Sequence, residues 1–415
     1  MNTYAATHSF IPADEEEKLA YELWNKIALD AITEKSSDIH FEPFRYESII
    51  RYRVDGVLQV VSRQTPDSMK ALLRVIKKTA GMNPDITDAP QAGKIIFASN
   101  RINNEEKTWD IRLSTLPTIF GEKLVCRVLD PGNAQNVLKG ELSLLGITGS
   151  DLDLVNGIIN KPYGLIVFCG PTGSGKTSTV YAALSHLAQK TENRCHIVTL
   201  EEPVEFVIDG VIQSNVDSEG EYNYFRAMKT LMRQDPDIIF IGEIPDRDTA
   251  SIALQAALTG HLIMIQLNSS DTAYAINTLF EMGMEPYLVS MCIEGIISQR
   301  LFRKICPECK QQVPVNREVI NRISEDVDDP DSIKNIWRGA GCEKCRGTGY
   351  RGRMAIYEIL PGTAQIREFI AAKPTLIEMR EKFRSLGYPN LRKAAIKKAI
   401  EGETTLEEAI RCACI

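Results

Sequence analysis

A phosphate-binding loop between an apolar strand and a helix constrains this chain more than any other feature of its sequence. Residues 165–169 predict a buried strand, and residues 178–188 predict a helix. The run between them fits the pattern G-x-x-x-x-G-K-[ST] at every position, and its glycines leave backbone N–H groups room to surround phosphate oxygens. The predicted nucleotide-binding residues are Gly170, Pro171, Thr172, Gly173, Ser174, Gly175, Lys176, Thr177 and Ser178.

Two side chains of this loop have predicted chemical roles. Lys176 is expected to reach the β- and γ-phosphates of a nucleoside triphosphate, and the hydroxyl of Thr177 to bind Mg²⁺. The N-terminus of the following helix adds the positive end of its dipole. The chain is therefore predicted to bind a nucleoside triphosphate with Mg²⁺.

The composition is that of a globular protein, with 415 residues of which 44% are hydrophobic and 25% charged. The formal net charge of -7 and the lack of a Lys/Arg block argue against a nucleic-acid partner, because phosphate-backbone binding needs a basic face. Residues 1–18 hold no apolar stretch, which excludes a signal peptide, and no apolar run reaches the roughly 18 residues of a membrane span. We therefore expect a cytoplasmic protein that reaches a membrane only peripherally, through partners.

The patterning predicts an α+β domain over residues 1–130, a linker over 131–144, a P-loop core over 145–300 and a C-terminal region over 301–415. Apolar strands alternate with helical stretches in the core, which favours a parallel sheet flanked by helices and the α/β class. The capping box Thr404-x-x-Glu407 predicts the start of the last helix. The expected strands cover residues 48–54, 58–62, 94–97, 108–114 and 124–129, then 165–169, 196–200, 238–241 and 262–267.

Hydrolysis needs carboxylates near the Mg²⁺ ion and the attacking water, and two glutamates follow predicted strands where open α/β sheets place their ligands. Glu243 follows the strand 238–241, and we predict that it assists the Mg²⁺ site, with Gly242 where an Asp is usual. Glu205 is predicted to be the general base that accepts a proton from the water. Glu201 and Glu202 lie in the same short run and compete for that role.

Two C-x-x-C pairs form the strongest metal signal in the chain. Cys306, Cys309, Cys342 and Cys345 together supply four thiolates, which predicts a closed, structural Zn²⁺ site. Reduced free thiols and redox dithiols are the alternatives, although a redox pair is more typical of a thioredoxin-like βαβ setting.

Several sequence runs occur in an order that carries a family resemblance. They are Ser37–Pro43, Arg51–Gly56, Pro90–Gly93, Arg112–Pro117 and Gly121-Glu122 in the first domain, then the P-loop, Glu201–Glu205, Arg233–Asp237, Thr259–His261, Ser298–Leu301, the tetracysteine module and Gly349–Arg353. On these runs the chain resembles the secretion ATPases that drive type II secretion and type IV pilus assembly.

The resemblance implies a RecA-like P-loop core preceded by a smaller PAS-like domain and followed by the zinc module and helices. It implies a homohexamer that hydrolyses ATP, with Arg112 and Arg127 contacting the phosphates from the first domain and His261 opening a "His box" beside the nucleotide. Interdomain motion would then be passed to an inner-membrane platform protein of the pilus or secretion machine. A tetracysteine module is typical of the assembly and secretion members of the family.

Three residues depart from the family pattern: Glu202 replaces an Asp, Pro245 replaces an Arg, and Asn268 replaces a second His. Asn268 can donate a hydrogen bond but cannot become cationic, which leaves a slow enzyme or a non-catalytic ATP-binding ring subunit as an alternative. A nucleic-acid motor is another alternative, because related ring ATPases serve helicases. The first family run begins near Ser37, so we expect a short form of the family or a chain trimmed of N-terminal domains.

Overall fold

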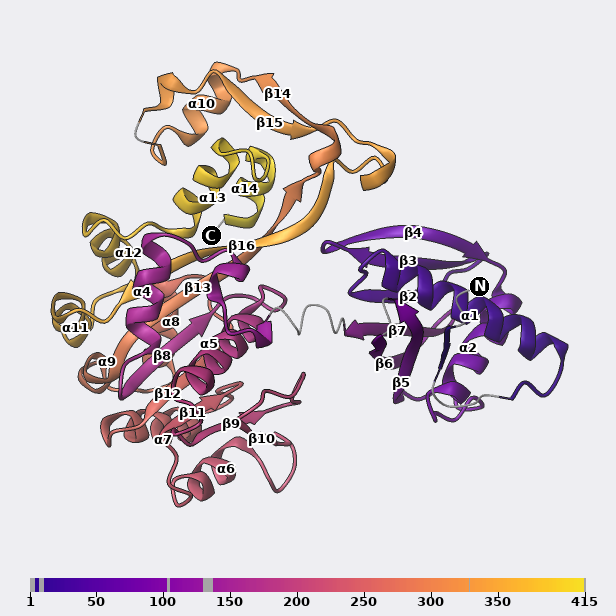
Figure 1. The fold of residues 1–415 in the computed structure, drawn as a ribbon, viewed down its shortest axis with the longest axis horizontal. Coiled ribbons are helices and arrows are strands. Elements are labelled where there is room, and N and C mark those ends of the chain that lie inside the picture. The colour runs from indigo at the N-terminus through magenta and orange to yellow at the C-terminus, as the bar shows by residue number, and fades with distance from the viewer. Residues whose placement is uncertain (1–3, 7–10, 103–104, 130–136, 328, 414–415) are drawn as a thin grey trace. The chain divides into compact units, whose positions relative to one another are not determined.

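The computed structural model describes residues 4–6, 11–102, 105–129, 137–327 and 329–413 (Figure 1). The chain divides into two compact units, Met1–Ala134 and Gln135–Ile415. Residues 131–136 of the predicted linker lie outside the described residues. None of the helices in the described ranges is long and apolar enough to cross a membrane.

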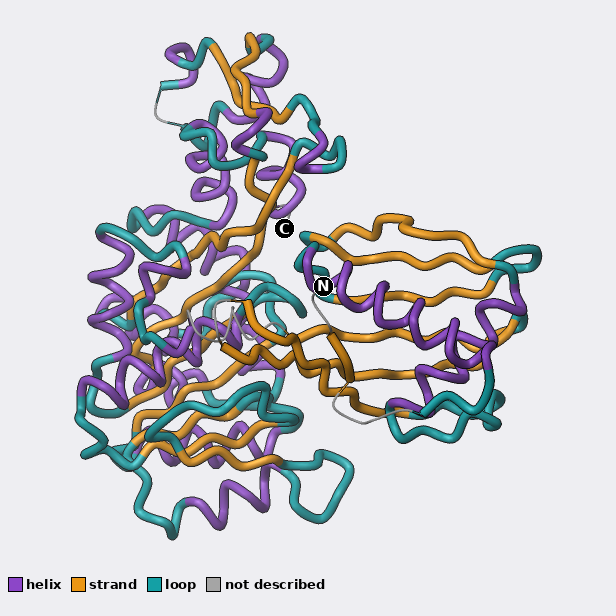
Figure 2. Tube along the Cα trace, turned by 45° about the vertical axis from the view of Figure 1, so that its right-hand side comes forward, coloured by secondary structure: helices purple, strands orange, loops and turns teal. Residues whose placement is uncertain are grey.

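The first unit is built around an antiparallel sheet with the strand order β1-β5-β6-β7-β2-β3-β4. Its strands are β1 (Tyr4–Ala6), β2 (Asp38–Pro43), β3 (Ser48–Val54), β4 (Val57–Gln64), β5 (Ala92–Ile102), β6 (Glu105–Thr118) and β7 (Gly121–Leu129). Helices α1 (Glu15–Thr33) and α2 (Pro66–Thr79) lie against this sheet (Figures 1 and 2). The unit therefore has the expected α+β character, and the five strands predicted for it are present.

The two faces of this sheet differ in polarity because side chains alternate along each strand. On β2, Ile39 and Phe41 are fully buried, and the Phe41 ring lies 6.2 Å from the ring of Trp24 on α1. The intervening residues Asp38 and His40 lie on the opposite face, among charged side chains of the neighbouring strands. Burial of the apolar face against the two helices thus fixes the register and places these charged side chains on the other face.

The second unit is built around a sheet with the strand order β10-β9-β11-β12-β8-β13-β16, in which only β16 is antiparallel to its neighbour. Its strands are β8 (Gly164–Cys169), β9 (Ile197–Glu201), β10 (Ile212–Asn215), β11 (Ile238–Ile241), β12 (Leu262–Leu267), β13 (Ile293–Ile305) and β16 (Tyr350–Pro361). This mainly parallel sheet confirms the predicted α/β class of the P-loop core.

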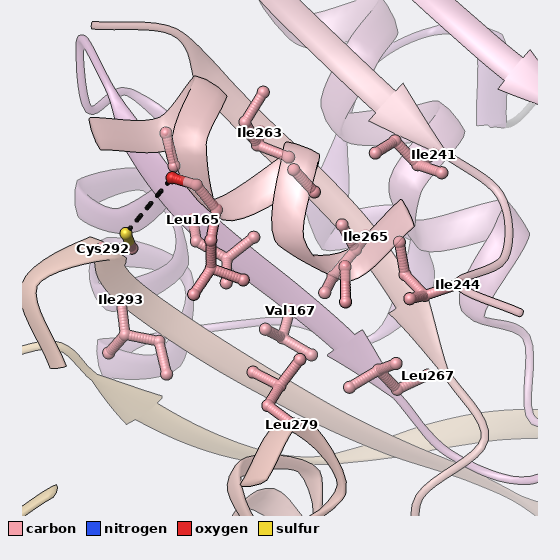
Figure 3. Packing of buried hydrophobic residues seen from close by; sticks show 14 of the residues in the cluster. Leu165, Val167, Ile241, Ile244, Ile263, Ile265, Leu267, Leu279, Cys292 and Ile293 are labelled. Atoms are coloured by element: carbon pink, nitrogen blue, oxygen red, sulfur yellow. Dashed lines mark hydrogen bonds between the residues drawn. The ribbon is translucent and has the colours of Figure 1, made fainter. Parts of the chain in front are cut away.

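Helices cover both faces of this sheet, so its central strands are apolar throughout. The helices around the core are α4 (Ser150–Ile159), α5 (Lys176–Lys190), α6 (Tyr224–Leu231), α7 (Arg247–Leu258), α8 (Thr272–Glu281) and α9 (Pro286–Cys292). Leu165 and Val167 of β8 pack with α7, α8 and α9, whereas Ile166 and Phe168 pack with α4 and α5. Figure 3 shows the first of these cores, with Cys292 packed into it as a small buried side chain.

The C-terminal region extends from the sheet along β13 and β16, which lead to a separate pair of strands (Figure 1). That pair is β14 (Lys310–Pro314) and β15 (Asn335–Gly339), and the helices are α10 (Arg317–Ile323), α11 (Ala364–Ala371), α12 (Leu376–Ser385), α13 (Leu391–Ile400) and α14 (Leu406–Ala413). Phe302 of β13 and Ile356 of β16 form a core with α13 and α14. Neither of these two long strands was among the strands predicted from the sequence.

The last helix begins one residue later than its predicted capping box. The Thr405 hydroxyl accepts a hydrogen bond from the Glu408 N–H at 3.1 Å, as an N-cap does. Thr404 instead donates its hydroxyl to the Arg303 carbonyl oxygen at 2.7 Å. The predicted capping box Thr404-x-x-Glu407 is therefore wrong by one residue, because the Thr404 hydroxyl is hydrogen-bonded to β13 and Thr405 is the N-cap.

Glu408 is expected to stabilise the second unit in a pH-dependent way. Burial alone raises its pKa, but hydrogen bonds from Arg411 and Arg303 outweigh burial and hold the pKa at about 2. A carboxyl with a depressed pKa stabilises the fold above its unfolded value of about 4.3 and loses that contribution as the pH falls toward 2. Glu408→Gln should lower the free energy of unfolding by about 2 kcal/mol at pH 7.

Urea unfolding of this variant between pH 7 and pH 2 measures the effect. The difference from wild type should shrink as the pH falls below 5, because the unfolded wild-type chain then takes up a proton at this position while the folded chain keeps its carboxylate charged until about pH 2. Glu407→Gln, a change at the exposed neighbour on the same helix, should leave the stability unaltered. A wild-type advantage that is constant across this pH range would contradict the assignment.

Candidate nucleotide site and tetracysteine cluster

The phosphate-binding loop lies between the end of β8 and the start of α5, and it contacts Gln299 of β13. Gly170 and Gly175 have positive φ angles of 151° and 89°. A Cβ on Gly170 would lie 2.5 Å from the Gln299 carbonyl oxygen, and one on Gly175 would lie 2.7 Å from Gln299 Nε2. Gln299 donates to the Ser174 carbonyl oxygen at 2.9 Å and accepts from the Thr179 hydroxyl at 2.8 Å. Only glycine fits these two positions, so the backbone can keep the curvature that phosphate binding requires.

The loop lysine is buried and has three hydrogen-bond acceptors. Lys176 Nζ donates to the carbonyl oxygens of Gly170 at 2.6 Å and Pro171 at 3.2 Å, and to Asn268 Oδ1 at 3.0 Å. Burial lowers the pKa of Lys176, because a desolvated site disfavours the charged form. Thr177 follows in the first turn of α5 and is half-buried. The residue at which the chain departs from the family's second His is thus a direct neighbour of this lysine.

Glu243 follows β11 at the same edge of the sheet. Its side chain is exposed and interacts electrostatically with Lys176 and with Tyr224. A Cβ on the preceding Gly242 would lie 3.3 Å from the Leu200 carbonyl oxygen and 3.4 Å from the Tyr224 hydroxyl. The neighbouring strand and this tyrosine therefore leave little room for the Asp that is usual at position 242.

The three glutamates after β9 have different surroundings, which the sequence alone could not separate. Glu201 is buried and accepts hydrogen bonds, while Glu202 accepts from the Ser218 N–H at 2.9 Å. Glu205 is exposed, and its backbone N–H donates to the Tyr181 hydroxyl at 3.1 Å. Parallel strands end at one edge of a sheet, so the loop residues, Glu243 and Glu205 all lie at that edge.

His261 lies at the opposite edge. β12 runs parallel to β8, with Leu262 opposite Gly164 and Leu267 opposite Cys169, and the P-loop begins only after Cys169. The strand rise places His261 roughly 20 Å from that end of the strand. The expected place of His261 beside the nucleotide is therefore wrong, because the other end of β12 faces the P-loop. Asn268, at the other end of the same strand, lies on that side.

Arg112 and Arg127 belong to the charged face of the first unit. They lie directly opposite each other on β6 and β7. Arg127 Nε donates to Asp38 Oδ1 at 3.2 Å, and Arg53 Nε lies 3.7 Å from the other oxygen of that carboxylate. Lys94 of β5 continues the row beside Arg112. Two of these cations surround the Asp38 carboxylate, and Lys94 pairs with Asp110 at 2.6 Å. A row of cations of this kind suits phosphate groups, and a phosphate contact from this face stays a prediction.

The four cysteines of the two C-x-x-C pairs come together between β13 and β16. Their sulfur atoms all lie within 4.8 Å of one another. Three pairs of sulfur atoms are 3.7–3.8 Å apart: Cys306–Cys342, Cys309–Cys345 and Cys342–Cys345. Four thiolates around a tetrahedral Zn²⁺ ion are about 3.8 Å apart, so the arrangement fits that metal. Burial alone raises the pKa of Cys345, but backbone N–H groups of Cys342 and Gly349 outweigh it and lower the pKa to about 6.

Two polar side chains beside the P-loop have no role predicted from the sequence. Gln299 supports the loop, and Tyr181 contacts the segment that carries Glu205. Gln299 lies in the run Ser298–Leu301, which contributes to the family resemblance but from which no chemical role could be predicted. Tyr181 had no signal, because an aromatic residue on a core helix is most simply a packing residue.

A phosphate-binding loop with carboxylates after the neighbouring parallel strands defines the class of protein as a P-loop ATPase. The family model described as "Type II/IV secretion system protein" matches residues 13–411, and the chain belongs to this family of secretion ATPases. It is 37% identical over 399 residues to the Type IV pilus assembly ATPase PilB of Thermus thermophilus, and 36% identical over 406 residues to the Type II secretion system protein E of Aeromonas hydrophila. These alignments cover 96% and 98% of this chain, but 43% and 77% of the two relatives.

Solved structures share the fold at lower sequence identity. The Yersinia pseudotuberculosis ATPase DotB superposes with a TM-score of 0.69 at 18% identity, covering 99% of this chain and 97% of that one. The pilus retraction motor PilT with bound ADP superposes with a TM-score of 0.56 at 21% identity, covering 93% and 96%. The chain therefore shares its fold with these two proteins.

Proposed function

We propose that this chain is the ATP-hydrolysing subunit of a machine that assembles a pilus or secretes proteins. The observation that carries the proposal is the convergence of Lys176, Glu243 and Glu205 at one sheet edge, in a member of the secretion-ATPase family. Its relatives are named as pilus assembly ATPases and type II secretion proteins, which supports the same kind of work here.

Each residue of the site has a proposed part in hydrolysis. Lys176 and the loop N–H groups neutralise the β- and γ-phosphates of ATP, and Thr177 and Glu243 hold Mg²⁺, the glutamate through water. Glu205 accepts a proton from the attacking water. Asn268 lies beside Lys176 and can donate its amide to the γ-phosphate, which replaces one function of the missing His.

Assembly and metal content complete the proposal. We infer that six copies form a ring in which Arg112 and Arg127 contact phosphates from the first unit, so that motion of that unit follows hydrolysis. The ring would act at the cytoplasmic face of an inner membrane, on a platform protein of the machine. The four cysteines hold one structural Zn²⁺, supported by their sulfur separations.

Steady-state ATP hydrolysis by the purified full chain tests this function, together with its mass in solution and its response to added DNA. Mg²⁺-dependent turnover at the mass of a hexamer, unaffected by DNA, is the expected result. Bound ATP without turnover would favour the non-catalytic ring subunit, which Pro245 and Asn268 suggest. Turnover stimulated by DNA would favour a nucleic-acid motor.

A further inference from the structure

We propose that Tyr181 is a positioning residue for Glu205, acting through its backbone from the P-loop helix. Tyr181 is fully buried and lies five residues after Lys176 on α5. The inference rests on the proposed ATPase function and adds to it a residue that has no part in binding the nucleotide.

The hydroxyl of Tyr181 makes two hydrogen bonds of different kinds. It donates its proton to the Glu201 carboxylate, and it accepts the backbone N–H of Glu205 at 3.1 Å. A tyrosine hydroxyl has one proton, so donation to the carboxylate leaves its lone pairs to face the Glu205 N–H. Burial and the neighbouring glutamates raise the pKa of Tyr181 well above its usual value, and the hydroxyl keeps this proton.

The Glu201 carboxylate, which accepts the Tyr181 hydroxyl proton, has only uncharged hydrogen-bond donors among the described residues. It is 3% exposed, and no cation pairs with it in the part of the chain that the structure describes. Besides Tyr181, the Thr199 hydroxyl and the Gln213 side chain donate to its Oε1 atom, the latter at 3.2 Å. A buried carboxylate depends strongly on such donors, so the loss of one is costly and the arrangement is rigid.

The same network holds the segment that contains Glu205 at further points. The Tyr181 ring packs edge-on against Phe206, with ring centroids 4.6 Å apart and an interplanar angle of 77°. Gln213 donates to the Phe206 carbonyl oxygen at 3.2 Å and accepts from the Ile208 N–H at 2.7 Å. Residues 205–208 are therefore held by α5 and β10 around one buried carboxylate.

The position of Tyr181 along α5 joins the two halves of the proposed site. Five residues of helix span about 7.5 Å, so one rigid element carries both the phosphate-binding lysine and the hydroxyl that holds the Glu205 backbone. A general base works only at hydrogen-bond distance from the water it activates, and small displacements reduce the rate strongly. The network thus sets the distance between the phosphates and the proposed base.

Tyr181→Phe tests the inference, because it removes the hydroxyl and keeps the ring that packs on Phe206. We expect kcat to fall about 10- to 100-fold while KM for ATP changes less than about threefold, since the P-loop is unaltered. The matched control is Tyr52→Phe in the first unit, where a buried hydroxyl donates to the Ile27 carbonyl oxygen at 2.8 Å. This control should change kcat less than about twofold, because the buried hydroxyl that it removes is not part of the proposed site.

The double variant Tyr181→Phe/Glu205→Ala separates positioning from general damage. If Tyr181 acts through Glu205, adding Tyr181→Phe to Glu205→Ala should cost less than about a further twofold in kcat. A full, additive loss in the double variant overturns the inference, as does wild-type kcat in Tyr181→Phe when Glu205→Ala is inactive. In both cases the proposed ATPase function stands. Failure of the proposed ATPase function would look different, because the wild type would then show no turnover. Full turnover in Glu205→Ala would show that Glu205 is not the general base, and the positioning role of Tyr181 would fall with it.

Discussion

Replacing Glu243 by glutamine is expected to lower the turnover of ATP about 100-fold or more. The change keeps the size of the side chain and removes its charge, while the P-loop glycines, Lys176 and Thr177 stay in place. Binding of ATP should therefore stay within about threefold of wild type, because those loop groups dominate the contact with the phosphates. Steady-state hydrolysis, with the dissociation constant of a fluorescent ATP analogue measured separately, resolves the two effects.

Two companion variants make this result specific. Lys176→Ala should lose nucleotide binding as well as turnover, because it removes the cation that faces the phosphates. Glu281→Gln changes an exposed glutamate at the end of α8 and should hydrolyse ATP as the wild type does. Near-normal turnover in Glu243→Gln would show that the exposed carboxylate after β11 is outside the reaction.

The sequence was sufficient for the P-loop core because its signals are local. The apolar runs that become β8, β11 and β12 are short, are interrupted only by Gln266 of β12, and are followed by glycine or polar residues. This is the pattern of strands buried on both faces. The G-x-x-x-x-G-K-[ST] pattern fixes its own place after a strand and before a helix. The parallel sheet and the edge at which its loops converge follow from these local signals.

The strands β13 and β16 escaped prediction because their sequences mix apolar and charged residues. Arg300, Arg303 and Lys304 interrupt the apolar pattern of β13, and the strand crosses the point at which a domain boundary was expected. Arg303 is accommodated by a tertiary contact, an ion pair with Glu408 on α14. Contacts between residues so distant in the sequence leave no periodic signal, so propensity reasoning cannot find them.

The error at His261 has a related cause. A strand of six residues has two ends on opposite edges of the sheet, and composition does not say which end faces the ligand. Only the pairing of β12 with β8 shows that Asn268, and not His261, lies beside Lys176. The departure from the family pattern that suggested a slow enzyme thus falls at a residue in contact with the P-loop.

Removal of the proposed Zn²⁺ from the tetracysteine cluster is expected to unfold the segment between β13 and β16. A structural Zn²⁺ site contributes on the order of 10 kcal/mol to the fold it closes. Besides the cluster, this segment has the short pair β14–β15 and the seven-residue helix α10, whose Ile323 packs with α13 and α14. Cys345→Ser should abolish the stoichiometric zinc, because this residue is a proposed ligand and its sulfur accepts two backbone N–H groups. Zinc content per chain and limited proteolysis between residues 306 and 349 measure the effect.

Nucleotide binding gives this prediction a second, independent readout. Gln299, which supports the P-loop, is buried and lies opposite Tyr357 of β16, directly after the part of β13 that pairs with β8. Loss of the metal should therefore unfold the segment between β13 and β16 without lowering the affinity for ATP more than about threefold. Cys195→Ser, a change at a partly buried cysteine outside the cluster, should keep one zinc per chain and full resistance to protease. Retention of zinc in Cys345→Ser would remove that residue from the ligand set. An apo chain as protease-resistant as the holo form would show that the segment folds without its metal, so that the four thiols would serve some purpose other than stability.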